Sequence, residues 1–591
     1  MKKIYLLLVL LLVAFKPAFG SVINNIGLDP TQKTSDPVSA DLFNNGQKEV
    51  IYTQNGQVYA YDKNGIIPGF PWKHTYFNAA SSLAIVDLYG DGNKYVIGGC
   101  YNKTAGNEVC VYDSHGVAPH GWPQKVSSYI GGAPAIADLD NNHQKEIIVA
   151  TNMQVYIFNS DGKLRSNWPK TVEFTGRPGV IGMNGVSTSP VIADMDGDGA
   201  LDIIVATTSG LINVWNKDGN LIHKYYGTYM LGTAPAVADL NQDGKNEIVF
   251  GDQTLNNSYN YVGNIYVYKK DGKLVWKKPI EGGLAHSSPV IGDLDKDGKL
   301  EIVATGSEGK VYVFKADGSL MPGWPKSIPG QIATSPVLLD IFQDKKLEIV
   351  VTAKDGNVYF WNYEGTLVPF QSGKNPMPNP MRILPQGNVL NSPVFGDFYG
   401  DGYLDIVAVA GNSIANWELP PYKTTLPWST PGYDFQRTGY YSYKSNDAEI
   451  VIYNQQPKNG SVTLNDSVTL NVKVTNNGYD TWKSGYDVVT KKFNDNAYDC
   501  RPHLYASKGN LLKWDLYVAT GLDKNKKYYG NDFGKDVKPG ESVLMTLIIP
   551  TTGQNAALFK KGSSYRLGVD VVHETVAWFG QEVKSAAFTI K

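Results

Sequence analysis

Residues 189–206 read SPVIADMDGDGALDIIVA, and a stretch of this kind recurs along the whole first part of the chain. A short apolar run ends in Asp194, a polar turn follows, and a second apolar run begins at Asp202. Two short apolar runs joined by a glycine-containing turn are typical of a β-hairpin. Eight such units follow one another, and the aspartates that end their first runs are Asp41, Asp87, Asp138, Asp194, Asp239, Asp293, Asp340 and Asp397.

Each unit continues with a third apolar run, a tight turn that is often Asp-Gly, and a fourth segment that often carries Trp beside Pro. The units start roughly 45–57 residues apart, the size of a four-stranded propeller blade. The third run of the sixth unit, KVYVF (310–314), is apolar on both faces of a strand. Such a strand belongs in a sheet that is covered on both sides, as blades around an axis are. We therefore predict an all-β chain whose propeller has eight repeats, with seven blades as the alternative.

The rest of the chain is expected to contain a leader, a linker and a second β domain. Residues 1–20 begin with Lys2 and Lys3, continue with an apolar run and end with small residues before Ser21, which is typical of a secretory signal peptide. We assign 21–440 to the propeller and 441–446 to a polar linker. Residues 447–591 lack the repeat and alternate in the manner of an immunoglobulin-like β-sandwich. No segment beyond the leader is apolar for long enough to cross a bilayer, so we expect an exported protein that is secreted, periplasmic or on the cell surface.

The turn between the first two strands carries alternating acidic side chains in several units. Carboxylate oxygens crowded on a tight loop bind a hard cation, and Ca²⁺ accepts irregular oxygen cages better than Mg²⁺ does. Aspartate and glycine also favour turns without any metal, but here the same pattern returns in successive units. We therefore predict Ca²⁺ as the cofactor. The predicted ligands are Asp194, Asp196, Asp198 and Asp202 in the fourth unit, Asp239, Asn241, Asp243 and Glu247 in the fifth, Asp293, Asp295, Asp297 and Glu301 in the sixth, and Asp138, Asp140, Asn142 and Glu146 in the third.

The unit resembles the FG-GAP, or VCBS, repeat found in the propellers of integrin α-subunits. The strand, the DxDxDGxxD/E turn and the following strand match that repeat, most closely in units four to six. The resemblance covers Ser35 to Tyr440 and implies a propeller that holds calcium in its blade hairpins. The seventh unit departs from the motif, with Phe342 at a ligand position and Lys345 in place of glycine, so we expect it to hold no metal. The integrin type has seven blades, whereas this chain has eight repeats.

Two cysteines flank a polar stretch, YNKTAGNEV, that is typical of a hairpin loop. Cys100 and Cys110 are expected to face each other across this hairpin, and export permits a disulfide between them. Two small buried thiols are the alternative.

The ligand is expected at the end of the propeller away from the acidic turns. Strands in a blade run antiparallel, so the acidic turns and the Asp-Gly turns share one end, and the longer connections share the other. Binding residues concentrate on loops held by a rigid scaffold, and Tyr and Arg are enriched among binding hot spots. The alternative is that these loops are merely variable connections. The predicted ligand-binding residues are Tyr259, Tyr261, Arg177 and Arg382.

No residues form a recognisable catalytic pattern. The eight histidines are scattered, and the sequence has no GxSxG motif and no phosphate-binding glycine loop. The formal net charge of −2 gives no electrostatic footprint for nucleic acid. We therefore expect a protein that binds an extracellular protein or glycan and is not an enzyme. A polysaccharide lyase on a calcium-bearing propeller and a structural envelope or spacer protein are the alternatives.

Overall fold

The structure is a computed structural model that describes residues 35–45, 47–62, 64–72, 77, 82–140, 142, 144–174, 185–186, 188–229, 233–256, 258, 260–284, 286–332, 334–342, 344, 346–368, 380, 392–396, 398 and 404–408. It describes the backbone alone for 22–24, 370–372, 375–377, 381–382, 409–410, 413–419 and the strands between 448 and 590. No helix that could cross a bilayer is found among these residues. The chain divides into two compact units, one of Met1–Val86 with Lys94–Tyr441 and the other of Asp87–Asn93 with Ser442–Lys591.

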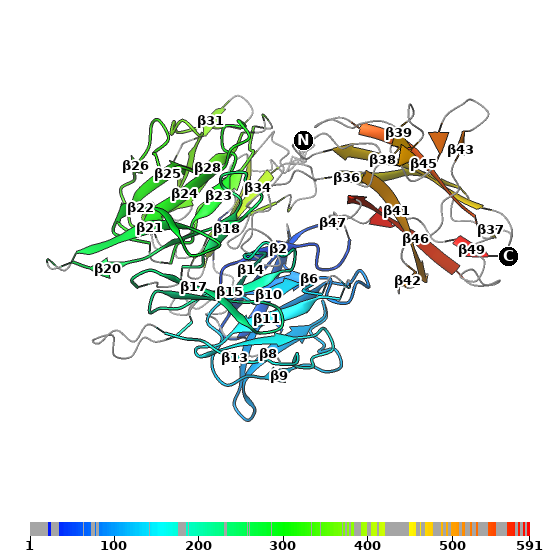
Figure 1. Cartoon of the computed structure of the whole chain (residues 1–591), viewed down its shortest axis with the longest axis horizontal. Helices are drawn as coiled ribbons and strands as arrows, with labels where there is room; N and C mark the ends of the chain where they lie inside the picture. The colour runs from blue at the N-terminus through cyan, green and yellow to red at the C-terminus, as the bar shows by residue number, and fades with distance from the viewer. Residues whose placement is uncertain are drawn as a thin grey trace, which may run out of the picture. The chain divides into compact units, whose positions relative to one another are not determined.

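Each of the eight repeats forms one antiparallel sheet with the same strand order (Figure 1). The first strand of each sheet is three residues long and fully buried. These strands are β2 (Val38–Ala40), β6 (Ala84–Val86), β10 (Ala135–Ala137), β14 (Val191–Ala193), β18 (Ala236–Ala238), β23 (Val290–Gly292), β27 (Val337–Leu339) and β33 (Val394–Gly396). The second strands are β3 (Glu49–Gln54), β7 (Tyr95–Asn102), β11 (Glu146–Ala150), β15 (Asp202–Ala206), β19 (Glu247–Gly251), β24 (Glu301–Gly306), β28 (Glu348–Thr352) and β34 (Leu404–Ala410).

The third strands are followed by short outer strands in most sheets. The third strands are β4 (Gln57–Asp62), β8 (Gly106–Tyr112), β12 (Gln154–Phe158), β16 (Leu211–Trp215), β21 (Tyr261–Lys269), β25 (Lys310–Lys315), β29 (Asn357–Trp361) and β35 (Ser413–Leu419). The outer strands of the first seven sheets are β5 (Gly65–Ile66), β9 (Gln124–Lys125), β13 (Lys170–Thr171), β17 (Leu221–Tyr226), β22 (Leu274–Glu281), β26 (Lys326–Ser327) and β32 (Met381–Arg382). Additional short strands are β20 (Thr254–Leu255), β30 (Phe370–Ser372) and β31 (Asn375–Met377).

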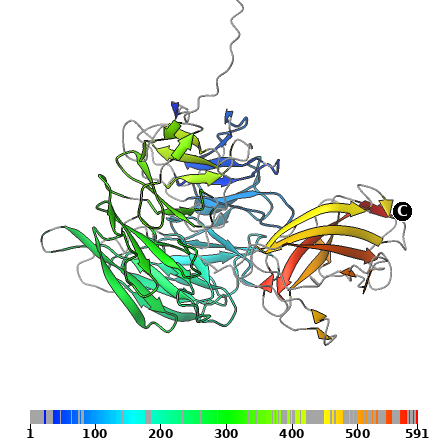
Figure 2. The ribbon, with the colours of Figure 1, turned by 90° about the horizontal axis from the view of Figure 1, so that it is seen from above.

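The eighth sheet takes its outer strand from the beginning of the chain. Strand β1 (Val22–Asn24) pairs antiparallel with β35, with Val22 opposite Ala415. The first and last sheets also share an apolar core in which Val50 and Tyr52 pack with Val394 and Val407. Figure 2 shows these two sheets, far apart in the sequence, side by side. The ring of sheets is therefore closed through both strand pairing and packing.

The core lies between neighbouring sheets, as the two-faced apolar strands predict. In β25 the four residues 311–314 are at most 8% exposed, although their side chains alternate between the two faces. Apolar clusters join the third sheet to the fourth, the fourth to the fifth and the seventh to the eighth. The predicted all-β fold class and the β-propeller architecture are confirmed, and the strand pairing gives one sheet for each of the eight repeats.

Tryptophans of the outer segments tie successive sheets together at one end. The indole N–H of Trp324, in the sixth repeat, donates to the carbonyl of Tyr363 in the seventh at 2.8 Å. Trp168 makes the same bond to the carbonyl of Lys217 at 3.2 Å. The equivalent bonds run from Trp122 to Ser160 at 3.0 Å and from Trp276 to Ala316 at 2.8 Å. The accepting carbonyls all lie in the turn between the third and fourth strands of the next sheet, which fixes that turn beside its neighbour.

The described strands of the second unit form two larger sheets and two sheets of two strands each. The first is formed by β36 (Ala448–Gln456), β38 (Ser467–Asn476) and β45 (Ser542–Pro550). The main strands of the second are β41 (Tyr498–Ala506) and β46 (Ser564–His573). The side chains of this unit lie outside the described residues, and its assignment as an immunoglobulin-like sandwich stays a prediction.

Candidate metal sites in the blade hairpins

The hairpin between β14 and β15 shows how the acidic turn is built. Asp202 opens β15 and pairs with Ala193, the last residue of β14. The Oδ2 atom of Asp202 accepts the N–H of Met195 at 2.8 Å, whereas its Oδ1 atom is buried without a hydrogen-bond partner. Carboxylate oxygens of Asp194, Asp196 and Asp202 lie within 4.8 Å of one another. A buried carboxylate oxygen without a donor is costly, and a cation held among three acids removes that cost.

The first aspartate of the turn is held by backbone N–H groups. In the fourth hairpin Asp194 accepts the N–H of Gly197 at 2.6 Å and that of Gly199 at 3.0 Å. Gly199 has a φ of 86°, a left-handed conformation that glycine adopts without strain. The equivalent bonds run from Gly244 to Asp239 at 2.8 Å and from Gly298 to Asp293 at 3.0 Å. The glycines of the motif therefore shape the turn so that its acidic side chains converge.

A buried acid closes seven of the eight hairpins in the same way. In each, the carboxylate accepts the N–H of the residue that follows the first aspartate. Besides Asp202, these acids are Glu49 (2.7 Å from Leu42), Glu146 (2.8 Å from Leu139), Glu247 (3.0 Å from Leu240), Glu301 (2.9 Å from Leu294), Glu348 (2.9 Å from Ile341) and Asp405 (2.7 Å from Phe398). In the second hairpin Tyr95 stands at this position. The closing acid thus belongs to the framework of the hairpin even where other predicted ligands are missing.

The sixth hairpin gathers its acids as the fourth does. Carboxylate oxygens of Asp293, Asp295 and Asp297 lie within 4.8 Å of one another. Asp297 also pairs with Lys299 at 3.0 Å, but that lysine is exposed. In the fifth hairpin the amide of Asn241 donates to Glu247 at 2.9 Å. The fold therefore brings together three of the four predicted ligands in the sixth turn, and it joins Asn241 to Glu247 in the fifth.

Crowding and burial make these carboxylates hard to ionise without a cation. Burial, together with the nearby carboxylates of Asp196 and Asp194, raises the pKa of Asp202 from 3.8 to about 7. The same causes raise the pKa of Glu247 to about 7 and that of Glu301 to about 8. A bound divalent cation favours the ionised carboxylates, because it supplies the opposite charge that the hairpin lacks.

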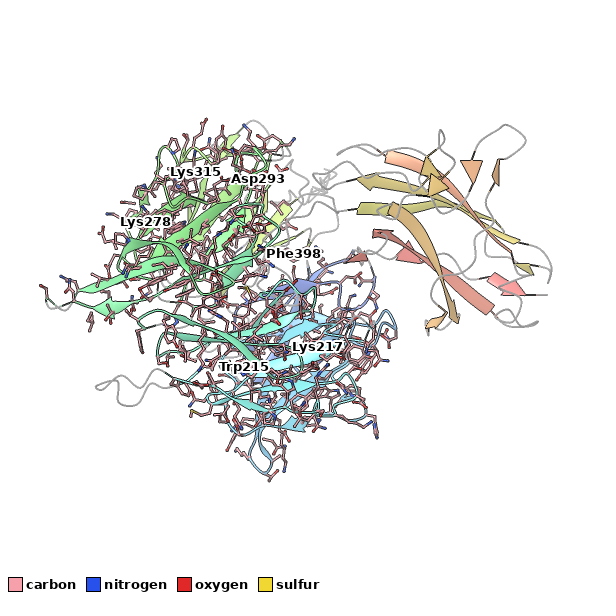
Figure 3. The ribbon with its side chains drawn as sticks, in the orientation of Figure 1. Trp215, Lys217, Lys278, Asp293, Lys315 and Phe398 are labelled. Carbon is pink, nitrogen blue, oxygen red and sulfur yellow. A yellow bond between two sulfur atoms is a disulfide. The ribbon has the colours of Figure 1, made fainter. Side chains whose placement is uncertain are left out.

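The third hairpin differs, because its central acid already has cationic partners. Both oxygens of Asp140 accept hydrogen bonds from the guanidinium of Arg165, at 2.7 and 2.8 Å. Lys217, in the turn that follows β16 beside Trp215 (Figure 3), lies 3.3 Å from the same carboxylate. The hydrogen bonds from Arg165 hold the pKa of Asp140 below its ordinary value. Asp138 and Glu146 keep their usual bonds to the N–H groups of Asn142 and Leu139.

The longer connections lie at the other end of the sheets, as the antiparallel pairing predicts. Tyr261 opens β21 opposite Leu255 of β20, and both side chains are exposed. Arg382 lies in β32 opposite Asn357, and its side chain is outside the described residues. Tyr259 and Arg177 also lie outside the described residues. At this same end Cys100 and Cys110 are joined by a disulfide with a Cα–Cα distance of 6.0 Å.

The comparisons with known proteins agree with this repeat geometry. A family described as FG-GAP-like repeat matches residues 138–205, 194–250, 239–304 and 340–408. The propeller contains FG-GAP-like repeats. Each match begins at the first aspartate of one hairpin and ends in the second strand of the next sheet. The FG-GAP-like repeat therefore includes the acidic turn and the two strands that hold it.

Solved structures of low sequence identity also resemble this chain. BamB from Moraxella catarrhalis is 14% identical, with 67% of this chain and 98% of that chain covered and a TM-score of 0.42. The Dos1 propeller is 12% identical, with 69% and 96% covered and a TM-score of 0.41. BBS1N in complex with ARL6DN, soaked with lead, is 12% identical, with 67% and 97% covered and a TM-score of 0.36. No curated protein matches the chain.

Proposed function

We propose that this chain is an exported propeller that binds Ca²⁺ in its blade hairpins and binds an extracellular protein or glycan at its opposite end. One observation carries the calcium part of the proposal. The Oδ1 atom of Asp202 is buried without a hydrogen-bond partner, among carboxylates that lie within 4.8 Å of one another. A turn that needed only backbone bonds would leave no such oxygen. Asp194, Asp196 and Asp202 would hold the ion in the fourth hairpin.

Calcium fits these turns better than other common metals. The clustered donors in the fourth and sixth hairpins are carboxylates, and hard oxygen donors favour Ca²⁺ or Mg²⁺ over metals that prefer nitrogen or sulfur. Each cluster is built on a short irregular turn, which suits the flexible coordination of Ca²⁺ more than the octahedron that Mg²⁺ demands. When bound, the ion supplies positive charge that stabilises the hairpin and the strands on either side of it.

Exposed aromatic side chains support the choice of the opposite end for ligand binding. Tyr101, Tyr226 and Tyr261 are 53%, 56% and 51% exposed, and Leu255 is 50% exposed. All four stand at the ends of strands remote from the acidic turns. Large, rigid aromatic groups bury much area at a low cost in conformational entropy, and they pack against both proteins and sugar rings. The rigid sheets behind them would keep such a surface in place.

Export is supported by the leader pattern in the sequence and by the disulfide. The bond between Cys100 and Cys110 joins the second and third strands of the second sheet. Such bonds persist in oxidising compartments and are rare in reducing ones.

The binding part of the proposal is tested with the full mature chain on arrays of glycans and extracellular proteins. We expect saturable binding that Tyr261→Ala, combined with Tyr226→Ala, weakens at least tenfold without lowering the melting temperature. Leu320→Ala, an exposed residue near the acidic end, is the matched control and should bind normally. The absence of any saturable ligand would favour a spacer protein, and turnover of an acidic polysaccharide would favour a lyase. Loss of binding in the control alone would reverse the assignment of the ends.

A further inference from the structure

The third hairpin contains cations that belong to the protein itself. Asp140 receives two hydrogen bonds from Arg165, and Lys217 lies 3.3 Å from it. Arg165 is largely buried, since its side chain is 14% exposed. We propose that Arg165, assisted by Lys217, replaces calcium in this hairpin, so that the third blade is stabilised without metal. The statement that Arg165 takes the place of calcium rests on the proposed function, whereas the pairing of Asp140 with Arg165 and Lys217 does not.

The place that Arg165 occupies in its repeat holds a different kind of side chain in later repeats. Its backbone N–H donates to the carbonyl of Ile157 at 2.8 Å. Met321 and Val368 make the same backbone bond in the sixth and seventh repeats, to Val313 and Phe360. These residues therefore occupy equivalent places, and in the later repeats an apolar side chain stands where the third repeat has a guanidinium. The fourth hairpin has no arginine at this place, and its acids remain clustered.

The second cation is also particular to the third hairpin. Lys217 and Lys270 occupy the same place in the turns of the fourth and fifth sheets, where they face the preceding hairpin. Lys217 lies beside the carboxylate of Asp140, whereas Lys270 donates to the backbone carbonyl of Asp196 and leaves its carboxylate in the acidic cluster. The carbonyl of Lys217 also accepts the indole N–H of Trp168 at 3.2 Å. Lys217 therefore links the third repeat to the fourth sheet, through its carbonyl to Trp168 and through its side chain to Asp140.

The third turn also differs from the fourth in its residues. Asn142 stands where the fourth hairpin has Asp198, and His143 stands where it has Gly199. The third hairpin thus has one carboxylate fewer than the fourth. It also has one guanidinium more. The planar guanidinium of Arg forms two parallel hydrogen bonds to one carboxylate, a geometry that a spherical metal ion does not require. The charge of the remaining acids is compensated from within the chain.

The first test counts bound calcium by equilibrium dialysis of the full chain with radioactive Ca²⁺. We expect Asp196→Asn to lose one equivalent and Asp140→Asn to lose none. A loss of one equivalent in Asp140→Asn would show that the third hairpin holds metal and would overturn the proposal. If the wild-type chain binds no calcium, the proposed function fails, and the inference is decided by a second test.

The second test needs no calcium and measures amide hydrogen exchange in chelator. The N–H groups of Leu139 and Asn142 are bonded to Glu146 and Asp138 and report on the third hairpin. We expect them to stay protected in the wild type and to exchange at least tenfold faster in Arg165→Met. Lys163→Ala, which removes an exposed ion pair with Asp161 in the adjacent turn, is the matched control and should change nothing. Unchanged protection in Arg165→Met would overturn the proposal.

Discussion

Replacing Glu301 with glutamine separates the charge of a closing acid from its shape. Glu301 is buried, accepts the N–H of Leu294 at 2.9 Å, and has a pKa that burial raises from 4.5 to about 8. A carboxyl with a raised pKa in the folded state binds its proton more tightly there than in the unfolded chain. Below about pH 4.5 Glu301 therefore does not lower the free energy of unfolding. The cost grows as the pH rises and is complete above about pH 8.

The size of this cost follows from the two pKa values. They differ by about 3.5, and each pH unit corresponds to about 1.4 kcal/mol, which gives an upper limit of about 5 kcal/mol. The neighbouring Lys296 and Asp297 are exposed, so water screens the site and reduces the cost to roughly 2 kcal/mol. Glutamine keeps an oxygen for the N–H of Leu294 and carries no charge. In chelator at pH 8, Glu301→Gln should therefore be more stable than wild type by roughly 2 kcal/mol.

Calcium should reverse this difference. At about 10 mM CaCl₂, a site with a Kd of about 0.1 mM adds about 2.7 kcal/mol to the wild type, and the variant lacks this ligand. Calorimetric melting at pH 8, with and without calcium, measures both effects. Glu348→Gln is the matched control, because Glu348 is equally buried, bonds the N–H of Ile341 at 2.9 Å and has a pKa of about 8 in a hairpin expected to hold no metal. It should be stabilised to the same extent in both buffers. A wild type that is already more stable than Glu301→Gln in chelator would refute the reasoning.

Two further predictions concern the framework of the propeller. Trp324→Ala should lower the stability by about 3–5 kcal/mol, because it removes a buried indole that also contacts Trp361; Trp324→Phe should lower it by only about 1 kcal/mol, the net value of one hydrogen bond. Urea unfolding measures both, and a Trp324→Phe variant as stable as the wild type would show that the indole N–H contributes nothing. Replacing Cys100 and Cys110 with serine should lower the melting temperature, at a cost of about 2–3 kcal/mol for a short closed loop; an unchanged melting curve would contradict this.

The repeat in the sequence was enough to predict the sheets and the acidic turns. Strand β25 is apolar on both faces, and a strand of that kind belongs in a sheet that is covered on both sides. The clustering of Asp194, Asp196 and Asp202 in the fourth hairpin could be predicted because these residues lie within nine residues of the chain. Local patterns of this kind can be predicted because they depend only on neighbours in the sequence.

Features that depend on the spatial neighbours of a residue could not be predicted in this way. Arg165 lies twenty-five residues from Asp140, and nothing in either segment alone indicates that they pair. The bond from Trp324 to the next sheet likewise requires the order of the sheets in space, although the recurring Trp-Pro pair was a signal that could have suggested a common role. The use of β1 to complete the eighth sheet also could not be predicted, because Val22 and Ala415 are neighbours only in space.

The central claim is that the acidic hairpins bind calcium through the carboxylates of the fourth and sixth repeats. Equilibrium dialysis of the mature chain against radioactive Ca²⁺ tests it most directly. We predict saturable binding with a Kd of about 10⁻⁴–10⁻³ M. The bound calcium should fall by one equivalent in Asp196→Asn, by one in Asp295→Asn, and by two in the double variant, whereas the exposed control Asp161→Asn should bind as the wild type does. Binding that is absent, or that both variants leave unchanged, would contradict the account.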